Sequence, residues 1–360
     1  MGKENRQITR NSTIDIIKGF ACIAVVLIHY NWSNDIGVFV KTLARFAVPF
    51  FFFVSGYYLP NREGMVTSDN VKRKMVHIID IAWKSGVFYL FFCVLWNSMY
   101  YKNWSLAEYT DSKISVASCI KFILGNDPFV YDHFWYILAL LYSYATVYVY
   151  SLFRQTIKKP CILLILSVFL MLGFSVLDEF NSYFHIKNAW HLDSEGSRFI
   201  LSNTFLFRAL PFFLFGMFVK LGSGNWNRKI SLTILCGFNF MGILLALYEA
   251  TMIKSVQFYL GSYISVISLI LISIWYPHQE LRFVEFIGNK LSMNVYLYHI
   301  AVGKIFDLIA QKNNLWNNSL FMMTRPFLIV TTSLLISYLL VDKKYSIFTK
   351  IKNHRNHEKV

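Results

Sequence analysis

Three residues able to do acid–base or electrostatic chemistry lie in the first strongly apolar stretch, NSTIDIIKGFACIAVVLIHYNW at residues 11–32. Asp15 and Lys18 stand near its start and His29 near its end. An ionisable side chain is costly in hydrocarbon, so each of them needs a partner, a watery cavity or a role. On an α-helix, Lys18 and His29 are roughly 20° from eclipsed and about 16 Å apart along the axis. We therefore expect one polar face along the whole helix.

His29 is the first candidate for a general base, because imidazole titrates near neutral pH and can take the proton of a hydroxyl. The alternative is a hydrogen-bonded side chain that packs helices together. Asp15 and Lys18 are three residues apart, so they can form an ion pair on the helix surface. Lys18 can also reach interfacial water through its long stem, or it can bind an anion.

Two arginines flank or interrupt later apolar stretches. Arg45 opens RFAVPFFFFVSGYYL at residues 45–59, and Arg208 lies within FLFRALPFFLFG at residues 205–216. An arginine inside an apolar run must face a bundle interior or a watery cavity. We expect both guanidinium groups to line a polar interior, and a structural ion pair is the alternative for Arg208.

Composition identifies the class of protein. The 360 residues are 56% hydrophobic and 18% aromatic, only 15% are charged, and the mean hydropathy is +0.44. This balance is typical of a polytopic membrane protein. The net charge of +15 does not indicate nucleic-acid binding, because the basic residues lie at the ends of apolar segments, as membrane anchors do. The five cysteines show no metal-ligand spacing, so we expect no metal.

Segment lengths and charge asymmetry predict the topology of an all-α protein with about ten transmembrane helices. The predicted spans are residues 14–32, 38–59, 79–100, 134–153, 161–177, 200–220, 231–248, 257–275, 288–306 and 324–341. The short loops on one side are rich in Lys and Arg, which predicts that both termini are cytoplasmic. The predicted domains are a cytoplasmic segment (residues 1–13), the transmembrane domain (residues 14–342) and a basic cytoplasmic tail (residues 343–360).

Two predicted outer loops, residues 101–133 and 178–199, exceed a minimal connection. Their mixture of aromatic, histidine and acidic residues suits a sugar-binding surface. An interfacial aromatic belt is the alternative interpretation, and the sequence alone leaves both open.

The run D-x-x-K-G-x-A-x-x-x-V-V-x-x-H at residues 15–29 resembles the opening helix of the acyltransferase-3 family of integral membrane acyltransferases. The run R-x-x-x-P-x-F-F-F-x-S-G at residues 45–56 resembles the next helix of that family. The resemblance extends more weakly over residues 11–342. It departs at Lys18, where the family usually has Arg, which binds phosphate as a planar fork whereas Lys acts as a point charge.

The resemblance implies roles for these residues. His29 would be the general base, and Arg45 and Arg208 would line the catalytic site. Lys18 would contact the phosphates of an acyl-CoA. The run VKRKMVHII does not reproduce the family's cytoplasmic R-x-x-R pair. It contains instead a basic cluster of Arg73, Lys74 and His77. This cluster either binds the phosphates of CoA or anchors the helix at the membrane surface.

Two later runs extend the resemblance. DHFWYILALL resembles the family's W-F-x-x-A-L-L segment and would bring Asp132, His133 and Trp135 to the outer surface, where a substrate binds. LSMNVYLYHI resembles a late S-x-x-x-Y-L-x-H helix and would place Tyr296 and His299 one turn apart, able to orient an acceptor or a donor carbonyl. A core pair without catalytic function is the alternative for these two residues.

The expected function is that of a multi-pass O-acyltransferase of the bacterial cytoplasmic membrane. It would move an acyl group, with acetyl as the first expectation, from acetyl-CoA or another acyl-CoA to a hydroxyl of an extracytoplasmic or lipid-linked cell-surface polysaccharide. A homo-oligomer is compatible with the sequence. The alternatives are a membrane transporter of a small polar solute and a non-catalytic protein of envelope assembly. The absence of an inverted sequence repeat disfavours the transporter.

Overall fold

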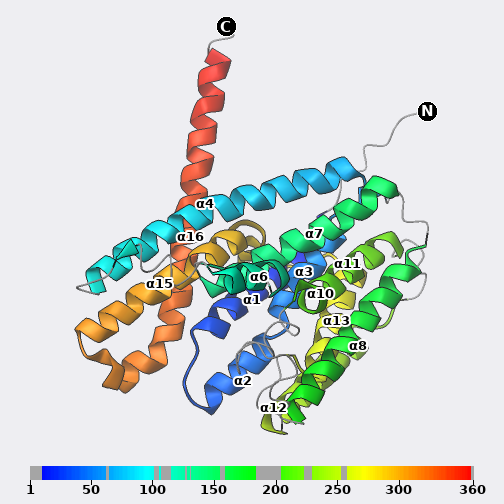
Figure 1. The fold of residues 1–360 in the computed structure, drawn as a ribbon, viewed down its shortest axis with the longest axis horizontal. Coiled ribbons are helices and arrows are strands. Elements are labelled where there is room, and N and C mark those ends of the chain that lie inside the picture. Colours follow the sequence, from blue (N-terminus) through cyan, green and yellow to red (C-terminus); the bar gives the residue numbers. More distant parts are fainter. Residues whose placement is uncertain are drawn as a thin grey trace. The chain divides into compact units, whose positions relative to one another are not determined.

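The computed structural model describes residues 10–61, 65–100, 105–106, 115–125, 128–129, 131–154, 159–183, 204–222, 229–252 and 258–357. These residues form helices joined by turns, and no strand occurs among them (Figure 1). The all-α class is therefore confirmed. The predicted outer loops 101–133 and 178–199 lie largely outside the described residues.

The chain divides into two compact units, which we call the first and the second unit. The first unit comprises Met1–Ala47, Ile230–Tyr248 and Gly261–Val360, and the second comprises Val48–Lys229 and Glu249–Leu260. Each unit is built from segments that are distant in sequence, so neither is a continuous part of the chain.

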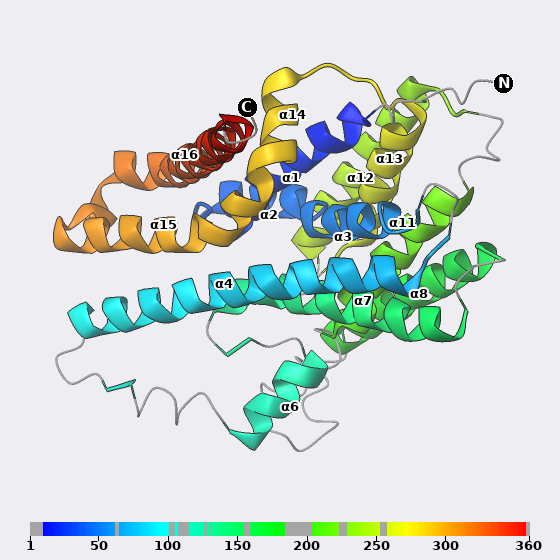
Figure 2. The same ribbon diagram turned by 90° about the horizontal axis from the view of Figure 1, so that it is seen from above.

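The helices of the first unit are α1 (Ser12–His29), α2 (Asp35–Ala44), most of α12 (Leu232–Met252), α13 (Leu260–Trp275), α14 (Arg282–Phe286), the π-helix η3 (Ile287–Leu291), α15 (Ser292–Lys312), η4 (Leu315–Asn317) and α16 (Ser319–His357). Those of the second unit are α3 (Ala47–Tyr57), α4 (Ser68–Tyr100), α6 (Val116–Gly125), η1 (Asp132–Phe134), α7 (Trp135–Phe153), α8 (Cys161–Tyr183), α10 (Phe205–Arg208) and α11 (Leu210–Gly222). Figure 2 shows the same helices from above.

Seven segments of the described chain are long and apolar enough to cross a membrane: Ser12–His29, Asp35–Tyr57, Ser68–Met99, Asp132–Phe153, Phe205–Gly222, Leu232–Met252 and Ser319–Val341. Two shorter apolar helices, Cys161–Gly173 and Leu260–Trp275, coincide with two further predicted spans. The chain thus has the architecture of a multi-pass membrane protein. The count of ten spans and the cytoplasmic termini stay predictions.

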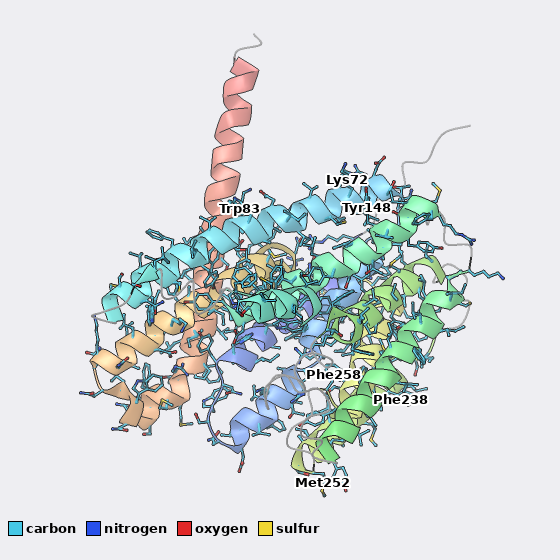
Figure 3. All side chains as sticks on the ribbon, viewed as in Figure 1. Lys72, Trp83, Tyr148, Phe238, Met252 and Phe258 are labelled. Atoms are coloured by element: carbon cyan, nitrogen blue, oxygen red, sulfur yellow. The ribbon has the colours of Figure 1, made fainter. Side chains whose placement is uncertain are left out.

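Large apolar side chains also point away from the helices, as lipid-facing residues do. Trp83 on α4 is 72% exposed and Phe238 on α12 is 53% exposed (Figure 3). In water such surfaces would be an aggregation hazard, whereas in a bilayer they face hydrocarbon.

The second and sixth predicted spans are each divided into two helices. α2 ends at Ala44 before α3 begins at Ala47, and α10 ends at Arg208 before α11 begins at Leu210. The physical reason is a proline in the first turn of each following helix, Pro49 and Pro211. A proline has no N–H, and its ring clashes with the carbonyl four residues earlier, so the helix cannot continue backwards through it.

Within the first unit, α1 packs at backbone distance against α14 and η3, which continue into α15. A methyl group added at Gly288 would lie 1.8 Å from the carbonyl oxygen of Asp15, and one at Gly19 would lie 2.2 Å from that of Val284. Fifteen residues further along both segments, a methyl group at Gly303 would lie 1.9 Å from the ring of Tyr30. From the Asp15–Gly288 contact to the Tyr30–Gly303 contact, the residue number rises by fifteen in both segments. The helix α1 and the segment η3–α15 therefore run in the same direction. Small residues allow this approach, as at other membrane helix contacts.

The second unit contains a similar glycine crossing. A methyl group added at Gly56 of α3 would lie 1.9 Å from the carbonyl oxygen of Phe213, and one at Gly216 of α11 would lie 2.2 Å from that of Phe53. Each glycine therefore makes room for the backbone of the other helix.

Gly288→Ala should destabilise the protein, because the added methyl group meets the backbone of Asp15 and not a flexible side chain. We expect a loss of about 1–3 kcal/mol, the usual cost of overpacking. Gly237→Ala is the matched control, since a methyl group there meets nothing within 4 Å. Thermal unfolding in detergent measures both variants, and equal midpoints would contradict the close contact.

Cysteine labelling tests whether α4 crosses the membrane. This helix has 33 residues, so its length of about 50 Å exceeds the roughly 30 Å of hydrocarbon. In a background without native cysteines, Lys72→Cys should label from the cytoplasmic side, as the basic segment ends predict. Ser98→Cys should label from the opposite side. Labelling of both positions from one side would exclude the predicted orientation of this span.

Candidate functional site

Two histidines meet where α1 ends. His29 is the last residue of α1 and its side chain is exposed, whereas His299 of α15 is completely buried. Their ring centroids are 5.2 Å apart and the ring planes are tilted by 47°. The parallel packing of α1 on α15 produces this pair, which joins two residues singled out in separate sequence motifs.

The backbone of α15 fixes the orientation of His299. Its Nδ1 lies 2.8 Å from the carbonyl oxygen of Tyr296 and 3.1 Å from that of Val295. A carbonyl only accepts hydrogen bonds, so Nδ1 carries the proton and, in the neutral ring, Nε2 carries the lone pair. The ring of Tyr296 stands 6.3 Å from that of His299. The arrangement presents an exposed imidazole, His29, against a second imidazole of defined tautomer.

A cation held by aromatic rings lies near the same end of α1. Arg325 of α16 donates from Nε to Asp307 of α15 at 3.0 Å and also from a terminal nitrogen. Its guanidinium carbon lies 5.4 Å from the ring centroid of Tyr30 and 5.2 Å from that of Trp316. Sequence reasoning missed this cluster. The available signal was an arginine at the start of one predicted span and an aspartate just beyond another.

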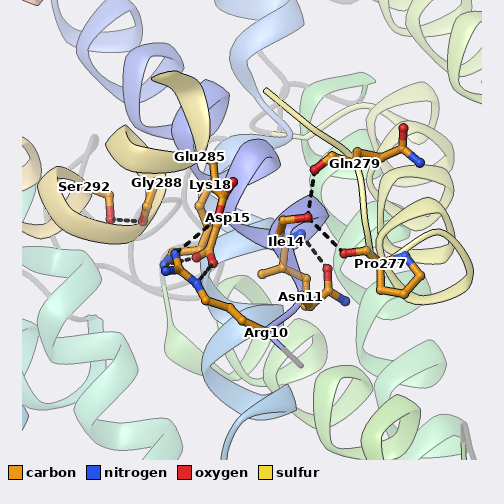
Figure 4. A network of polar contacts seen from close by, with 11 residues as sticks. Arg10, Asn11, Ile14, Asp15, Lys18, Pro277, Gln279, Glu285, Gly288 and Ser292 are labelled. Carbon is orange, nitrogen blue, oxygen red and sulfur yellow. Dashed lines mark hydrogen bonds and ion pairs between the residues drawn. The ribbon is translucent and has the colours of Figure 1, made fainter. Parts of the chain in front are cut away.

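An ionic network holds the other end of α1 (Figure 4). Asp15 accepts from Arg10 at 2.7 Å and from Lys18 at 3.3 Å, and Arg10 also lies 4.0 Å from Glu285. Asn11 caps the helix by accepting from the backbone N–H of Ile14 at 2.9 Å. The structure therefore contains the i, i+3 ion pair that the sequence allowed for Asp15 and Lys18.

This network affects what Lys18 can do. It contains two cations and two carboxylates, and the Lys18 side chain is only 19% exposed. A phosphate must therefore compete with Asp15 for the ammonium group. The distance from Lys18 to His29 along the helix axis remains about 16 Å, so the two residues serve different parts of any substrate.

In the second unit, the structure brings together two residues that the sequence assigned to different roles. The guanidinium carbon of Arg208, at the end of α10, lies 5.1 Å from the ring centroid of Trp135 at the start of α7. This is cation–π geometry, which suits a partly buried arginine. Arg45, in the first unit, is half-buried and follows the last residue of α2, so it does not open the next helix as expected.

The expectation that His133 lies at the surface is wrong. The side chain is 2% exposed, and its ring lies 4.8 Å from that of Tyr89 and 4.5 Å from that of Phe134. The tight 3₁₀ turn η1 directs neighbouring side chains differently, so Asp132 remains exposed while His133 enters the aromatic core.

The basic cluster Arg73, Lys74 and His77 lies in the first turns of α4, which begins earlier than the predicted span. All three side chains are exposed. Within the described part of the chain, no three His, Cys, Asp or Glu side chains converge as metal ligands.

Comparison with known proteins gives the family. A family model described as an acyltransferase domain, the acyltransferase-3 type, matches residues 11–342. A curated protein named amino-acid racemase, from Enterococcus faecalis, is 25% identical over 351 residues. The match covers 93% of this chain but 46% of that protein, so the chain spans about half the length of this relative. No solved structure matches the chain. Because the family model covers nearly all of its sequence, the chain belongs to the acyltransferase-3 family.

Proposed function

We propose that this protein is an O-acyltransferase of the bacterial cytoplasmic membrane. In this proposal it takes an acetyl group from cytoplasmic acetyl-CoA and transfers it to a hydroxyl of an extracytoplasmic or lipid-linked cell-surface polysaccharide. Family membership and the membrane-type helices support a membrane acyltransferase. The observation that carries the finer proposal is the exposed His29 against the oriented His299 at the end of an apolar helix.

The proposed reaction is direct acyl transfer. His29 accepts the proton of the acceptor hydroxyl as its oxygen attacks the thioester carbonyl. The tetrahedral oxyanion then collapses, the carbon–sulfur bond breaks, and the CoA thiolate leaves and regains a proton from the His29 imidazolium. His299 positions the His29 ring. Arg45, in the same unit as His29, supplies positive charge to the oxyanion, as such groups do in other acyl transfers.

The donor is proposed to enter at the opposite end of α1. Lys18 contacts a CoA phosphate, and the axial rise of about 16 Å to His29 resembles the reach of an extended pantetheine arm. Arg73, Lys74 and His77, in the exposed first turns of α4, are the alternative candidate for the phosphate contact. The negative charge of a phosphate suits the point charge of the Lys18 ammonium group. The phosphate must displace the Asp15 carboxylate from that group.

The acceptor is proposed to contact Asp132 and Trp135. A carboxylate and an aromatic face together suit a sugar, because one accepts hydrogen bonds from hydroxyls and the other stacks on the apolar face of the ring. His133 has no part in this contact, since it is buried against Tyr89.

Transport of an amino acid is the second candidate function. The Enterococcus faecalis relative is named an amino-acid racemase, so an amino acid is the solute to test first. Uptake of radiolabelled amino acids into vesicles containing the purified protein separates the two proposals. Transfer of labelled acetyl groups to the glycan without amino-acid uptake supports the enzyme, and the reverse result supports the transporter.

His29→Gln should nearly abolish acetylation of the glycan, because glutamine can hydrogen-bond but cannot accept a proton near neutral pH. Base catalysis typically contributes about 10²–10⁴ in rate, so a loss of that size is expected. His278→Gln is the control, since His278 is exposed and lies outside both histidine motifs. Mass spectrometry of the glycan measures acetyl content, and immunoblotting measures membrane insertion. A well-inserted variant within a few-fold of the parent would remove His29 from the role of base.

Lys18→Ala should raise KM for acetyl-CoA about ten-fold or more while kcat changes little, because a charged hydrogen bond to phosphate is lost from ground state and transition state alike. Lys18→Arg should retain most of the affinity. Lys84→Ala is a matched control: Lys84 also pairs with an aspartate on its own helix, Asp80, at 2.7 Å, but on the exposed face of α4. An unchanged KM in Lys18→Ala would leave Lys18 with the ion pair alone.

A further inference from the structure

A cleft of about 850 Å³ lies between α7, α8 and α11 of the second unit. Its volume falls within the range of about 300–1,000 Å³ that is usual for small-molecule sites. The three helices can be followed in Figure 2. None of the residues assigned above to acyl transfer lines this cleft, so it requires a separate explanation.

The walls of the cleft are predominantly aliphatic. They are formed by Val147 of α7, by Ile162, Leu163 and Leu166 of α8, and by Leu214 and Met217 of α11. Thr146 and Tyr150 also line the cleft. The Thr146 hydroxyl already donates to the carbonyl oxygen of Tyr142 at 2.9 Å, so the phenolic hydroxyl of Tyr150 is the main polar group among these two. Most of the wall therefore offers dispersion and apolar contact but few hydrogen bonds.

Two cations lie at one end of the cleft. Arg154 directly follows the last residue of α7, and Lys159 lies two residues before α8 begins. Both side chains are exposed, and neither forms an ion pair with any residue that the structure describes. Apolar helices end at the boundary between hydrocarbon and headgroups, so these cations lie at headgroup level.

We propose that this cleft binds a membrane lipid with an anionic phosphate headgroup. The acyl chain lies along α8 between α7 and α11, and Arg154 and Lys159 hold the phosphate. The match is between the two chemical halves of the site and those of the lipid: aliphatic walls contact the chain, and two cations contact the phosphate. Pantetheine fits less well, because its two amide groups need hydrogen-bonding partners that the aliphatic wall does not provide.

The affinity of the purified full-length chain for two lipids tests the proposal. After removal of endogenous lipid, native mass spectrometry measures binding of phosphatidylglycerol and phosphatidylcholine that carry the same acyl chains. Two cations near the headgroup should favour phosphatidylglycerol roughly 30-fold. In Arg154→Gln/Lys159→Gln, the two lipids should bind within about three-fold of each other. Leu163→Trp, which fills the cleft, should weaken both lipids.

The control variant is Lys72→Gln/Lys229→Gln, which removes two exposed cations that do not line the cleft, and it should retain the preference for phosphatidylglycerol. If the double cleft variant does not fold, Arg154→Gln alone should reduce the preference roughly five-fold. An undiminished preference in the folded cleft variants overturns the proposal. Displacement of bound phosphatidylglycerol by equimolar acetyl-CoA also overturns it, because the cleft would then be a donor site. Glycan acetylation is measured separately, so failure here leaves the acyl-transfer proposal untouched.

Discussion

The close packing of α1 on α14, η3 and α15 is the contact on which the first unit depends. It is possible because Gly19 and Gly288 have no side chains, so each backbone approaches the other directly. A continuous contact of this kind fixes both ends of α1 together. At one end it brings Glu285 to 4.0 Å from Arg10, which also pairs with Asp15, and at the other it sets His29 against His299. The π-helical turn in η3 belongs to this contact, and such turns recur at functional sites.

Polar groups in apolar surroundings explain much of the remaining detail. Asp15, Asp307 and Arg325 each contact an opposite charge, and Arg208 lies over the ring of Trp135. Such partners offset the cost of removing charge from water. The same requirement gives α1 two chemically different ends, an ionic one and an imidazole one. A long substrate with a charged end and a reactive end would match that division, which is the physical basis of the proposed donor path along this helix.

Proline-induced breaks give the chain another recurring feature. Arg45 and Arg208 both lie where one helix stops before a phenylalanine-rich helix begins. In each case the following helix contains a glycine, Gly56 or Gly216, that meets the backbone of the other. Proline frees carbonyl groups at the breaks, and the two arginines are the cations nearest to them in sequence.

The sequence by itself determined the all-helical membrane class, the approximate positions of the apolar segments, the Asp15–Lys18 pair and the family. These follow from composition, segment length and short-range spacing, which act locally and need no knowledge of packing. Only the tertiary structure decided that His29 faces His299, that His133 is buried, that Arg208 stacks on Trp135 and that Arg325 is held by Asp307 and two aromatic rings. Those outcomes depend on contacts between helices distant in the chain, and helical periodicity says which face is apolar but not which neighbour that face will meet.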